Sequence, residues 1–104
     1  MYLNVFRNRK RADIDAAAYA EDAARMEALA RQQPGFLAYR FYKSDDGESL
    51  SMSEWASADH ARAWARHAEH LAVQGRGRAD YYESYTVYSC DQPGVREFNA
   101  KDHT

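Results

Sequence analysis

The sequence of 104 residues predicts an α+β domain with the element order β-α-β-β-α-β, the arrangement of ferredoxin-like folds with one four-stranded antiparallel sheet. Two observations lead to this prediction. Four segments have the alternation or the aromatic content of strands: residues 1–8, 36–44, 48–56 and 81–90. The long segments that separate the first strand from the second, and the third from the fourth, favour helix because they are rich in Ala and nearly free of Gly and Pro.

The first strand is predicted from its alternation. Its side chains divide between two faces, with Leu3, Val5 and Arg7 on one and Tyr2, Asn4, Phe6 and Asn8 on the other. The basic run RNRKR at 7–11 is expected to be a solvated turn between strand and helix, since charge runs usually remain in water. We do not interpret it as a nucleic-acid patch.

The first helix is predicted to begin after Asp13 or Asp15, either of which is a suitable N-cap, and to extend to Gln33. Side chains at helical spacing form the stripe expected to face the core: Tyr19, Ala23, Met26 and Ala30. Asp22, Arg25 and Gln32 are expected to face solvent. Pro34-Gly35 ends the helix, because Pro disfavours helix in the residue before it and Gly permits the reversal.

A hairpin and a second helix follow. Asp45-Asp46-Gly47 predicts a tight turn between the second and third strands, because Asp and Gly tolerate the positive φ that such turns need. Ser57 is the expected N-cap of the second helix, and Asp59 in its first turn complements the helix dipole. We expect this helix to end near Arg66 and a further helical stretch to cover 68–74, with a break between them.

Composition limits the classes of protein. The chain has 14 basic and 16 acidic residues, and this balance does not favour a nucleic-acid partner, which requires an excess of Lys and Arg. Cys90 is the one cysteine, so an internal disulfide and a cysteine zinc site are excluded. No apolar run is long enough to span a bilayer, and no signal-peptide pattern is present, so we expect a cytoplasmic protein without membrane partners.

Both faces of the predicted sheet carry apolar side chains. Leu3 and Val5 oppose Phe6 on the first strand, and Phe36 and Tyr42 oppose other aromatic residues on the second. Two helices cover only one face of a sheet this size, and the other would leave a larger apolar patch than monomers usually expose. We therefore expect a homodimer in which a second copy covers that face.

Three segments of residues 1–90 resemble the antibiotic biosynthesis monooxygenase (ABM) family of small dimeric α+β barrels. The segments are QQPGFLAYRFY (32–42), DDGESLSMSEWAS (45–57) and HARAWARHAEHLAVQGRGRADYYESYTVY (60–88). The resemblance rests on their order: PGF after the first helix, Trp and Ser at the end of the third strand, Trp within the second helix, and Gly-Arg before an aromatic strand. It implies one domain over 1–90, and residues 91–104 form a C-terminal tail.

The resemblance implies a cleft between the helices and one sheet face, in which oxygenation proceeds without flavin, metal or nicotinamide. Some members of the family oxidise electron-rich aromatic polyketides to quinones, and others bind and degrade heme. We expect no cofactor, with heme as the alternative. The expected partners are a small aromatic substrate and dioxygen.

Trp64 leads the candidate site residues. At 100° per residue, His60, Trp64, His67 and Leu71 share one stripe, so an indole N–H donor and an imidazole base can serve one pocket. In the alternative, Trp64 is a core anchor and the His side chains are solvated. His60 stands where the polyketide oxidisers carry an Asn, and we assign it to substrate binding.

His67 and His70 are the two candidates for the base, because an imidazole exchanges a proton near neutral pH. Alternatively, His67 caps the end of a short helix at the expected break. The two His residues have a spacing that can bind a metal, but no further ligands accompany them, so we expect no metal site.

The remaining candidates come from the strands and the last connection. By position, Asn8 matches the strand-one Asn of the heme-degrading members; alternatively it is a turn residue that bonds its own backbone. Arg78 pairs with an anionic or phenolate substrate, or simply decorates a Gly-rich connection. Phe6 and Tyr82 are assigned to substrate binding. Tyr82 and Tyr85 are expected on opposite faces of the last strand, so at most one of them faces the cleft.

Three functions remain open. The first is cofactor-independent oxygenation of an electron-rich aromatic such as a polyketide-like compound or a quinol. The second is heme binding with oxidative cleavage, in which His67 or His70 would ligate the iron, because Gln74 stands where those members carry their ligating His. The third is a non-catalytic dimeric module that binds a hydrophobic metabolite.

Overall fold

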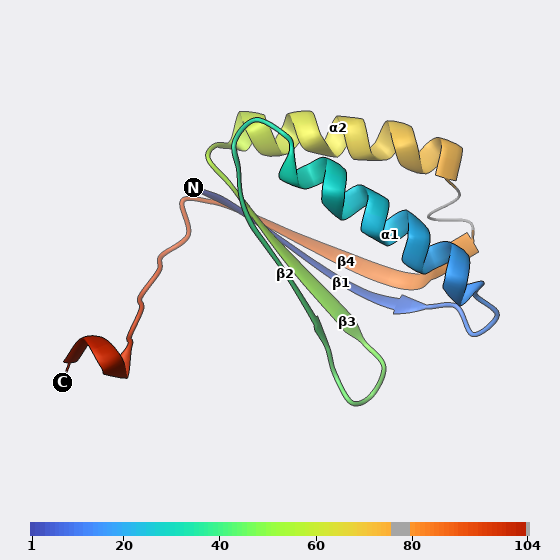
Figure 1. The fold of residues 1–104 in the computed structure, drawn as a ribbon, viewed down its shortest axis with the longest axis horizontal. Helices are drawn as coiled ribbons and strands as arrows, with labels where there is room; N and C mark the ends of the chain where they lie inside the picture. The colour runs from blue at the N-terminus through green and yellow to red at the C-terminus, as the bar shows by residue number, and fades with distance from the viewer. Residues whose placement is uncertain (76–79, 104) are drawn as a thin grey trace.

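The computed structural model describes the backbone of residues 1–75 and 80–103 and the side chains of 1–68 and 80–101. Its elements are β1 (Tyr2–Lys10), α1 (Ala16–Arg31), β2 (Phe36–Lys43), β3 (Ser49–Trp55), α2 (Ala58–Gly75), β4 (Tyr82–Asp91) and a short 3-10 helix, η2 (Ala100–His103). The strands form one antiparallel sheet in the order β2-β3-β1-β4. Both helices lie on the same side of this sheet (Figure 1). The predicted ferredoxin-like βαββαβ fold is confirmed.

Helix α1 begins where one of the two predicted caps stands. Asp15 is the N-cap, and its Oδ1 accepts a hydrogen bond of 3.0 Å from the backbone N–H of Ala18. The helix ends at Arg31, two residues earlier than predicted, and Gly35 then reverses the chain with a φ of +81°. Gly takes this conformation without the steric cost that other residues meet.

The stripe predicted to face inward along α1 is partly wrong. Ala23 is exposed, whereas Asp22, expected in solvent, is partly buried. The hydroxyl of Tyr81 donates a hydrogen bond of 2.5 Å to Oδ2 of Asp22. A carboxylate at a half-buried position is stabilised by such a donor. Because Tyr81 is 59 residues away along the chain, the helical pattern gave no sign of it.

Helix α2 is continuous from Ala58 to Gly75, so the predicted break after Arg66 is wrong. No Gly or Pro interrupts the segment before Gly75, and its Ala-rich composition favours helix throughout. The predicted N-cap is confirmed, because Oγ of Ser57 accepts a hydrogen bond of 3.2 Å from the backbone N–H of His60. His67 therefore lies within a helix, and the alternative in which it caps a helix end is wrong.

The core is centred on Trp55, whose side chain is fully buried at the end of β3. Ala30 of α1 and Ala61 of α2 are buried against it, because small side chains let both helices approach the ring closely. Tyr2, Phe36 and Trp64 surround this centre and are partly buried. The two helices are thus anchored to the sheet at the end where β1 begins and β3 ends.

The opposite, outer face of the sheet also carries large side chains. Tyr42 and Tyr88 are 56% and 50% exposed there. They share this face with Arg7 by register, since Tyr42 pairs with Leu50 and Leu50 with Arg7. The prediction that both faces of the sheet bear apolar groups is confirmed, and the helices leave the outer face open (Figure 1).

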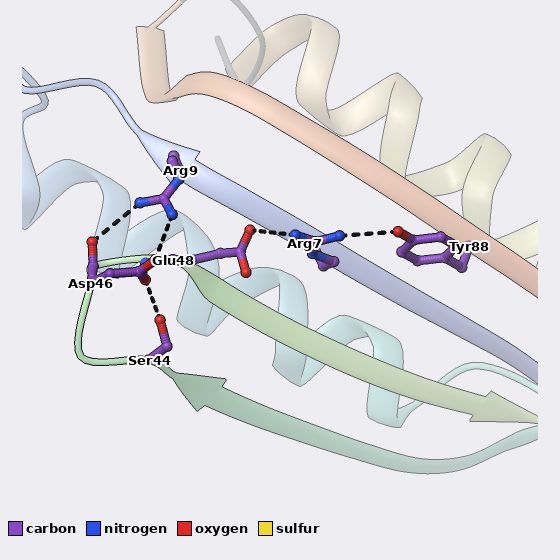
Figure 2. A network of polar contacts seen from close by, with 6 residues as sticks. All are labelled: Arg7, Arg9, Ser44, Asp46, Glu48 and Tyr88. Carbon is purple, nitrogen blue, oxygen red and sulfur yellow. Dashed lines mark hydrogen bonds and ion pairs between the residues drawn. The ribbon is translucent and has the colours of Figure 1, made fainter.

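The basic run 7–11 is not a solvated turn, because strand β1 continues to Lys10. On the outer face, Arg7 donates to Glu48 and to the hydroxyl of Tyr88, both at 3.0 Å (Figure 2). Arg9 pairs with Asp46 of the 44–48 hairpin at 2.8 Å. These partners come from β4 and the hairpin, segments far from β1 in the sequence, so the local pattern could not show these contacts.

The predicted hairpin is confirmed. The backbone N–H of Ser44 donates to the carbonyl of Glu48 at 2.8 Å, and Gly47 has a φ of +93°. The Ser44 hydroxyl and the backbone N–H of Glu48, followed by Arg9, hold the pKa of Asp46 well below its usual range. This carboxylate therefore ties the turn to β1.

Beyond β4 the chain leaves the sheet and ends in η2, away from the helices (Figure 1). Val95 and Phe98 in this tail are 63% and 78% exposed. Neither helix among the described residues is both long and apolar enough to cross a bilayer.

Candidate functional site

The side of the sheet that faces the helices carries two separate groups of side chains. We call Phe36, Trp55 and Trp64 the tryptophan cluster, and Phe6, Asn8, Lys10, Tyr19, Phe41, Tyr82 and Tyr85 the Lys10 cluster. In the sheet register Trp55 pairs with Tyr2, whereas Asn8 lies six residues further along β1, a distance of roughly 20 Å. Four of the eight predicted site residues belong to these groups: Trp64 to the first, and Phe6, Asn8 and Tyr82 to the second.

The tryptophan cluster is largely closed. The Trp64 ring stacks on Trp55 with centroids 6.0 Å apart and planes 23° from parallel, and Phe36 meets Trp55 edge-on at 5.6 Å. The indole N–H of Trp55 donates to Oγ of Ser53 at 3.0 Å. Trp64 therefore packs against Trp55 with one face of its ring, and only the part of the ring that Trp55 leaves uncovered is available to a ligand.

His67 is exposed one turn further along α2, with its ring centroid 5.5 Å from that of Trp64. The predicted neighbourhood of an indole and an imidazole is thus present on α2. Because α2 leads from the tryptophan cluster toward the start of β4, residues after Trp64 approach the level of the Lys10 cluster. The side chain of His70 and all of Arg78 lie outside the described residues.

His60 is engaged in packing. Its Nδ1 lies 2.7 Å from Oγ of Ser57, and its ring covers Gly35, where a Cβ would come within 2.3 Å of the imidazole Cγ. These contacts fix the start of α2 against the turn after α1. These contacts explain the position of the His60 side chain without a ligand.

Phe6, Tyr82 and Tyr85 form an aromatic group. The ring of Phe6 lies 5.3 Å from Tyr82 and 5.4 Å from Tyr85, and the two tyrosine rings are 6.0 Å apart. The prediction that the two tyrosines occupy opposite faces is therefore wrong. The register shifts between Arg9 and Lys10, and this bulge gives β4 an extra residue that turns Tyr82 to the face of Tyr85.

Lys10 is the site residue that the sequence reasoning missed. Its ammonium lies 4.8 Å from the ring centroid of Tyr19, 5.8 Å from Tyr82 and 6.0 Å from Phe41, distances at which a cation is attracted to an aromatic face. It also donates a hydrogen bond to Oδ1 of Asn8. The signal was present, because continuing the alternation of β1 by two residues places Lys10 on the face of Phe6 and Asn8.

Asn8 is 4% exposed and lies within the strand, so it is not a turn residue that bonds its own backbone. Its amide oxygen accepts the hydrogen bond that orients the Lys10 ammonium.

Burial, reinforced by the neighbouring Tyr19, raises the pKa of Tyr82, and burial together with Glu27 raises the pKa of Tyr39. These phenols are therefore neutral at physiological pH, and Lys10 supplies the charge of the cluster.

The Lys10 cluster is open to solvent on one side. Phe41 is 51% exposed and Tyr85 44%, although the register places both on the side of the sheet that faces the helices. Val87, the neighbour of Tyr85 on that face, is 53% exposed. The helices therefore leave an aromatic surface uncovered, beside a partly buried cation. Such a surface suits a flat aromatic molecule that carries a polar or anionic group.

Comparison with known proteins gives a family and a fold. The sequence model described as "Antibiotic biosynthesis monooxygenase" matches residues 1–76. The uncharacterized protein YqjZ of Bacillus subtilis (strain 168) is 44% identical over 69 residues, which are 66% of this chain and 60% of that protein. The aligned part thus spans less than two thirds of that relative.

Solved structures resemble the fold at low identity. Rv0793 from Mycobacterium tuberculosis superimposes with a TM-score of 0.73 at 19% identity, covering 94% of this chain and 98% of that one. A variant of SnoaB, a cofactor-independent oxygenase from Streptomyces nogalater, gives 0.71 at 18% identity, covering 93% and 94%. The monooxygenase ActVA-Orf6 of Streptomyces coelicolor, in complex with nanaomycin D, gives 0.66 at 16% identity, covering 94% and 92%.

Proposed function

Since the chain belongs to the antibiotic biosynthesis monooxygenase family, we propose that it is a cofactor-independent monooxygenase of an electron-rich aromatic small molecule, polyketide-like or a quinol. The observation that carries the proposal is the uncovered aromatic surface of Phe41 and Tyr85 on the helix side of the sheet, which continues into the partly buried rings of Phe6 and Tyr82. The description of SnoaB as a cofactor-independent oxygenase supports the same chemistry on this fold.

The reaction needs no redox centre in the protein. For an anthrone-like substrate, a base removes a proton from the ring CH₂, and the carbanion passes one electron to dioxygen. The resulting radical and superoxide combine to form a C–O bond, and the peroxide anion takes the proton back from the base to give a hydroperoxide. Loss of water from this hydroperoxide, with the second C–H proton, leaves a carbonyl. One oxygen atom enters the product and the other leaves as water, so the four electrons balance without an added reductant.

The residues divide this work. His67 is the proposed base among the described side chains, since it is exposed beside Trp64, and His70 is the second candidate. Trp64 and Asn8 are proposed as polar contacts to the substrate. Phe6 and Tyr82 supply the aromatic rings, and His60 and Arg78 remain proposed substrate-binding residues.

Oxygen uptake tests the proposal. With a hydroxyanthrone and no flavin or NADH, the protein should consume dioxygen and release the corresponding quinone. We expect His67→Ala to reduce the rate by 10²-fold or more, the usual contribution of a general base. Arg66→Ala, at the neighbouring exposed position of α2, should leave the rate unchanged. Uptake that requires flavin or NADH, or no uptake at all, would refute the proposal, the latter in favour of a binding module.

Heme binding is the second candidate, favoured by the exposed imidazole of His67 beside Trp64. This side chain would hold the iron, and heme would supply the oxidative chemistry. A titration with micromolar heme should then shift the Soret band, and His67→Ala should abolish the shift. An unchanged Soret band would exclude this candidate.

A homodimer is the proposed assembly, because half-exposed Tyr42 and Tyr88 lie on the outer face beside the apolar Leu3 and Val5. A second copy is the simplest cover for such a face. Light scattering should give twice the chain mass of 11.9 kDa, and a value near 11.9 kDa at high concentration would contradict it. A cytoplasmic location remains a proposal.

A further inference from the structure

We infer that Lys10 binds the anionic oxygen of a flat phenol or enol on the surface of the Lys10 cluster. This inference rests on the proposed function and deepens it, because it names the group that holds the negative charge of the substrate after deprotonation. Four features of the structure support it: the charge balance around Lys10, its unused donors, the way it is held, and the open rings beside it.

The charge balance differs between the two faces of the sheet. On the outer face Arg7 pairs with Glu48 at 3.0 Å, and Arg9 with Asp46 at 2.8 Å. Lys10, on the other face, forms no ion pair with any described residue. Asp22, an acid on α1, already accepts the hydroxyl of Tyr81, the neighbour of Tyr82 in the chain. The positive charge of a partly buried ammonium without a counter-ion is incompletely compensated, and an anionic ligand would supply the missing negative charge.

Lys10 also has donors to spare. An ammonium carries three N–H groups, and Oδ1 of Asn8 accepts one of them. The rings of Tyr19, Tyr82 and Phe41 surround the charge but accept only weakly through their faces. A phenolate or enolate oxygen is a far stronger acceptor. Two donors on one nitrogen suit an oxygen that bears a full or partial negative charge.

The ammonium is held before a ligand arrives. Asn8 is 4% exposed and lies in the middle of the sheet, so its amide provides a rigid support two residues before Lys10. Rings on α1, β2 and β4 enclose the side chain from three sides. A lysine restrained in this way loses less conformational freedom on binding than a surface lysine, which strengthens its interaction with a ligand.

The aromatic rings supply the remaining contact. Phe41, next to the ammonium, and Tyr85, next to Tyr82, are about half exposed, so a flat molecule can lie against this surface with its oxygen directed at Lys10. A positive charge within 4–6 Å lowers the pKa of a phenol by about 1–3 units. Lys10 would thus favour the anion that reacts with dioxygen, while the proton passes to the base on α2.

A coloured phenol that cannot react further tests the inference. A hydroxyanthraquinone is already oxidised, and its phenolate absorbs at longer wavelength than the phenol. Titrated from pH 4 to 10, the dye bound to the unaltered protein should ionise at least 1 pH unit lower than free dye. Lys10→Met should abolish this shift, whereas Lys10→Arg, which keeps the positive charge, should retain most of it. Lys43→Met is the matched control, since Lys43 is exposed on the same face and lacks a ring contact among the described residues.

The outcomes separate this inference from the proposed function. An anthraquinone without hydroxyl groups should bind equally to the unaltered protein and to Lys10→Met, which shows that the surface is intact. Unaltered protein that leaves the dye pKa unchanged, or Lys10→Met that retains the shift, overturns the role of Lys10, whatever the oxygen uptake. A shift that depends on Lys10 without any oxygen uptake keeps the anion site and refutes the oxygenase.

Discussion

The two clusters on the helix side of the sheet are both built from aromatic residues, but the tryptophan cluster is closed and the Lys10 cluster is open to solvent. In the tryptophan cluster the rings of Trp55, Trp64 and Phe36 cover one another, and the one N–H whose partner is known is bonded to Ser53. In the Lys10 cluster three rings surround a cation, and Phe41 and Tyr85 remain about half exposed. Aromatic residues that satisfy one another stabilise a fold, whereas those that leave charge and surface unsatisfied provide a binding site.

The largest expected effect is on stability at the tryptophan end. Trp55→Ala should lower the free energy of unfolding by about 3–5 kcal/mol, because it leaves a cavity between both helices and the sheet. Phe41→Ala, in the open Lys10 cluster, should cost about 1 kcal/mol or less, because a half-exposed ring gains little from burial. Urea denaturation measures both values. Equal losses would show that the two clusters do not differ in packing.

A smaller effect is expected where α2 is joined to the turn after α1. Gly35→Ala should destabilise the protein by about 1–3 kcal/mol, because the new Cβ meets the His60 ring and the residue has a φ of +81°. In the background of His60→Ala the same change should cost less, because the ring is gone and only the backbone strain and the His60 Cβ, 2.6 Å from the new Cβ, remain. A double-mutant cycle measures the difference. Additive losses would mean that the ring does not confine this glycine.

The smallest effect is expected at alkaline pH in the Lys10 cluster. Burial raises the pKa of Tyr82 above its unfolded value near 10, so its contribution to stability is complete below pH 10 and is lost as the pH rises further. Absorbance at 295 nm should show a tyrosine that ionises late and disappears in Tyr82→Phe. Tyr42→Phe, on the exposed outer face, is the control and should leave the late-ionising tyrosine in place. Identical titration curves for the two variants would contradict the burial of Tyr82.

Local chemistry was sufficient for most of the fold. The Asp45-Asp46-Gly47 turn, the Asp15 and Ser57 caps and the reversal at Gly35 depend on residues close in the chain, and all were predicted. The break after Arg66 was predicted wrongly, because a run of helix-favouring residues up to Gly75 was divided without a Gly or Pro to justify it.

The candidate site was predicted less completely. Phe6, Asn8 and Tyr82 were named, and the structure brings them together, but their central cation was assigned to a turn. Lys10 belongs to β1 only because β4 pairs with it across a bulge. That bulge also brings Tyr82 and Tyr85 to one face. Pairing between β1 and β4 joins residues more than 70 positions apart, and no local pattern reveals it.

The sequence by itself determined the order of strands and helices, their turns and caps, and the presence of apolar side chains on both faces of the sheet. These features follow from backbone preferences and periodicity within a few residues. Tertiary structure alone decided that Trp64 packs on Trp55, that Asp22 is held by Tyr81, and that Lys10 is enclosed by three rings. Each depends on side chains from different elements meeting in space, where register and packing select the neighbours.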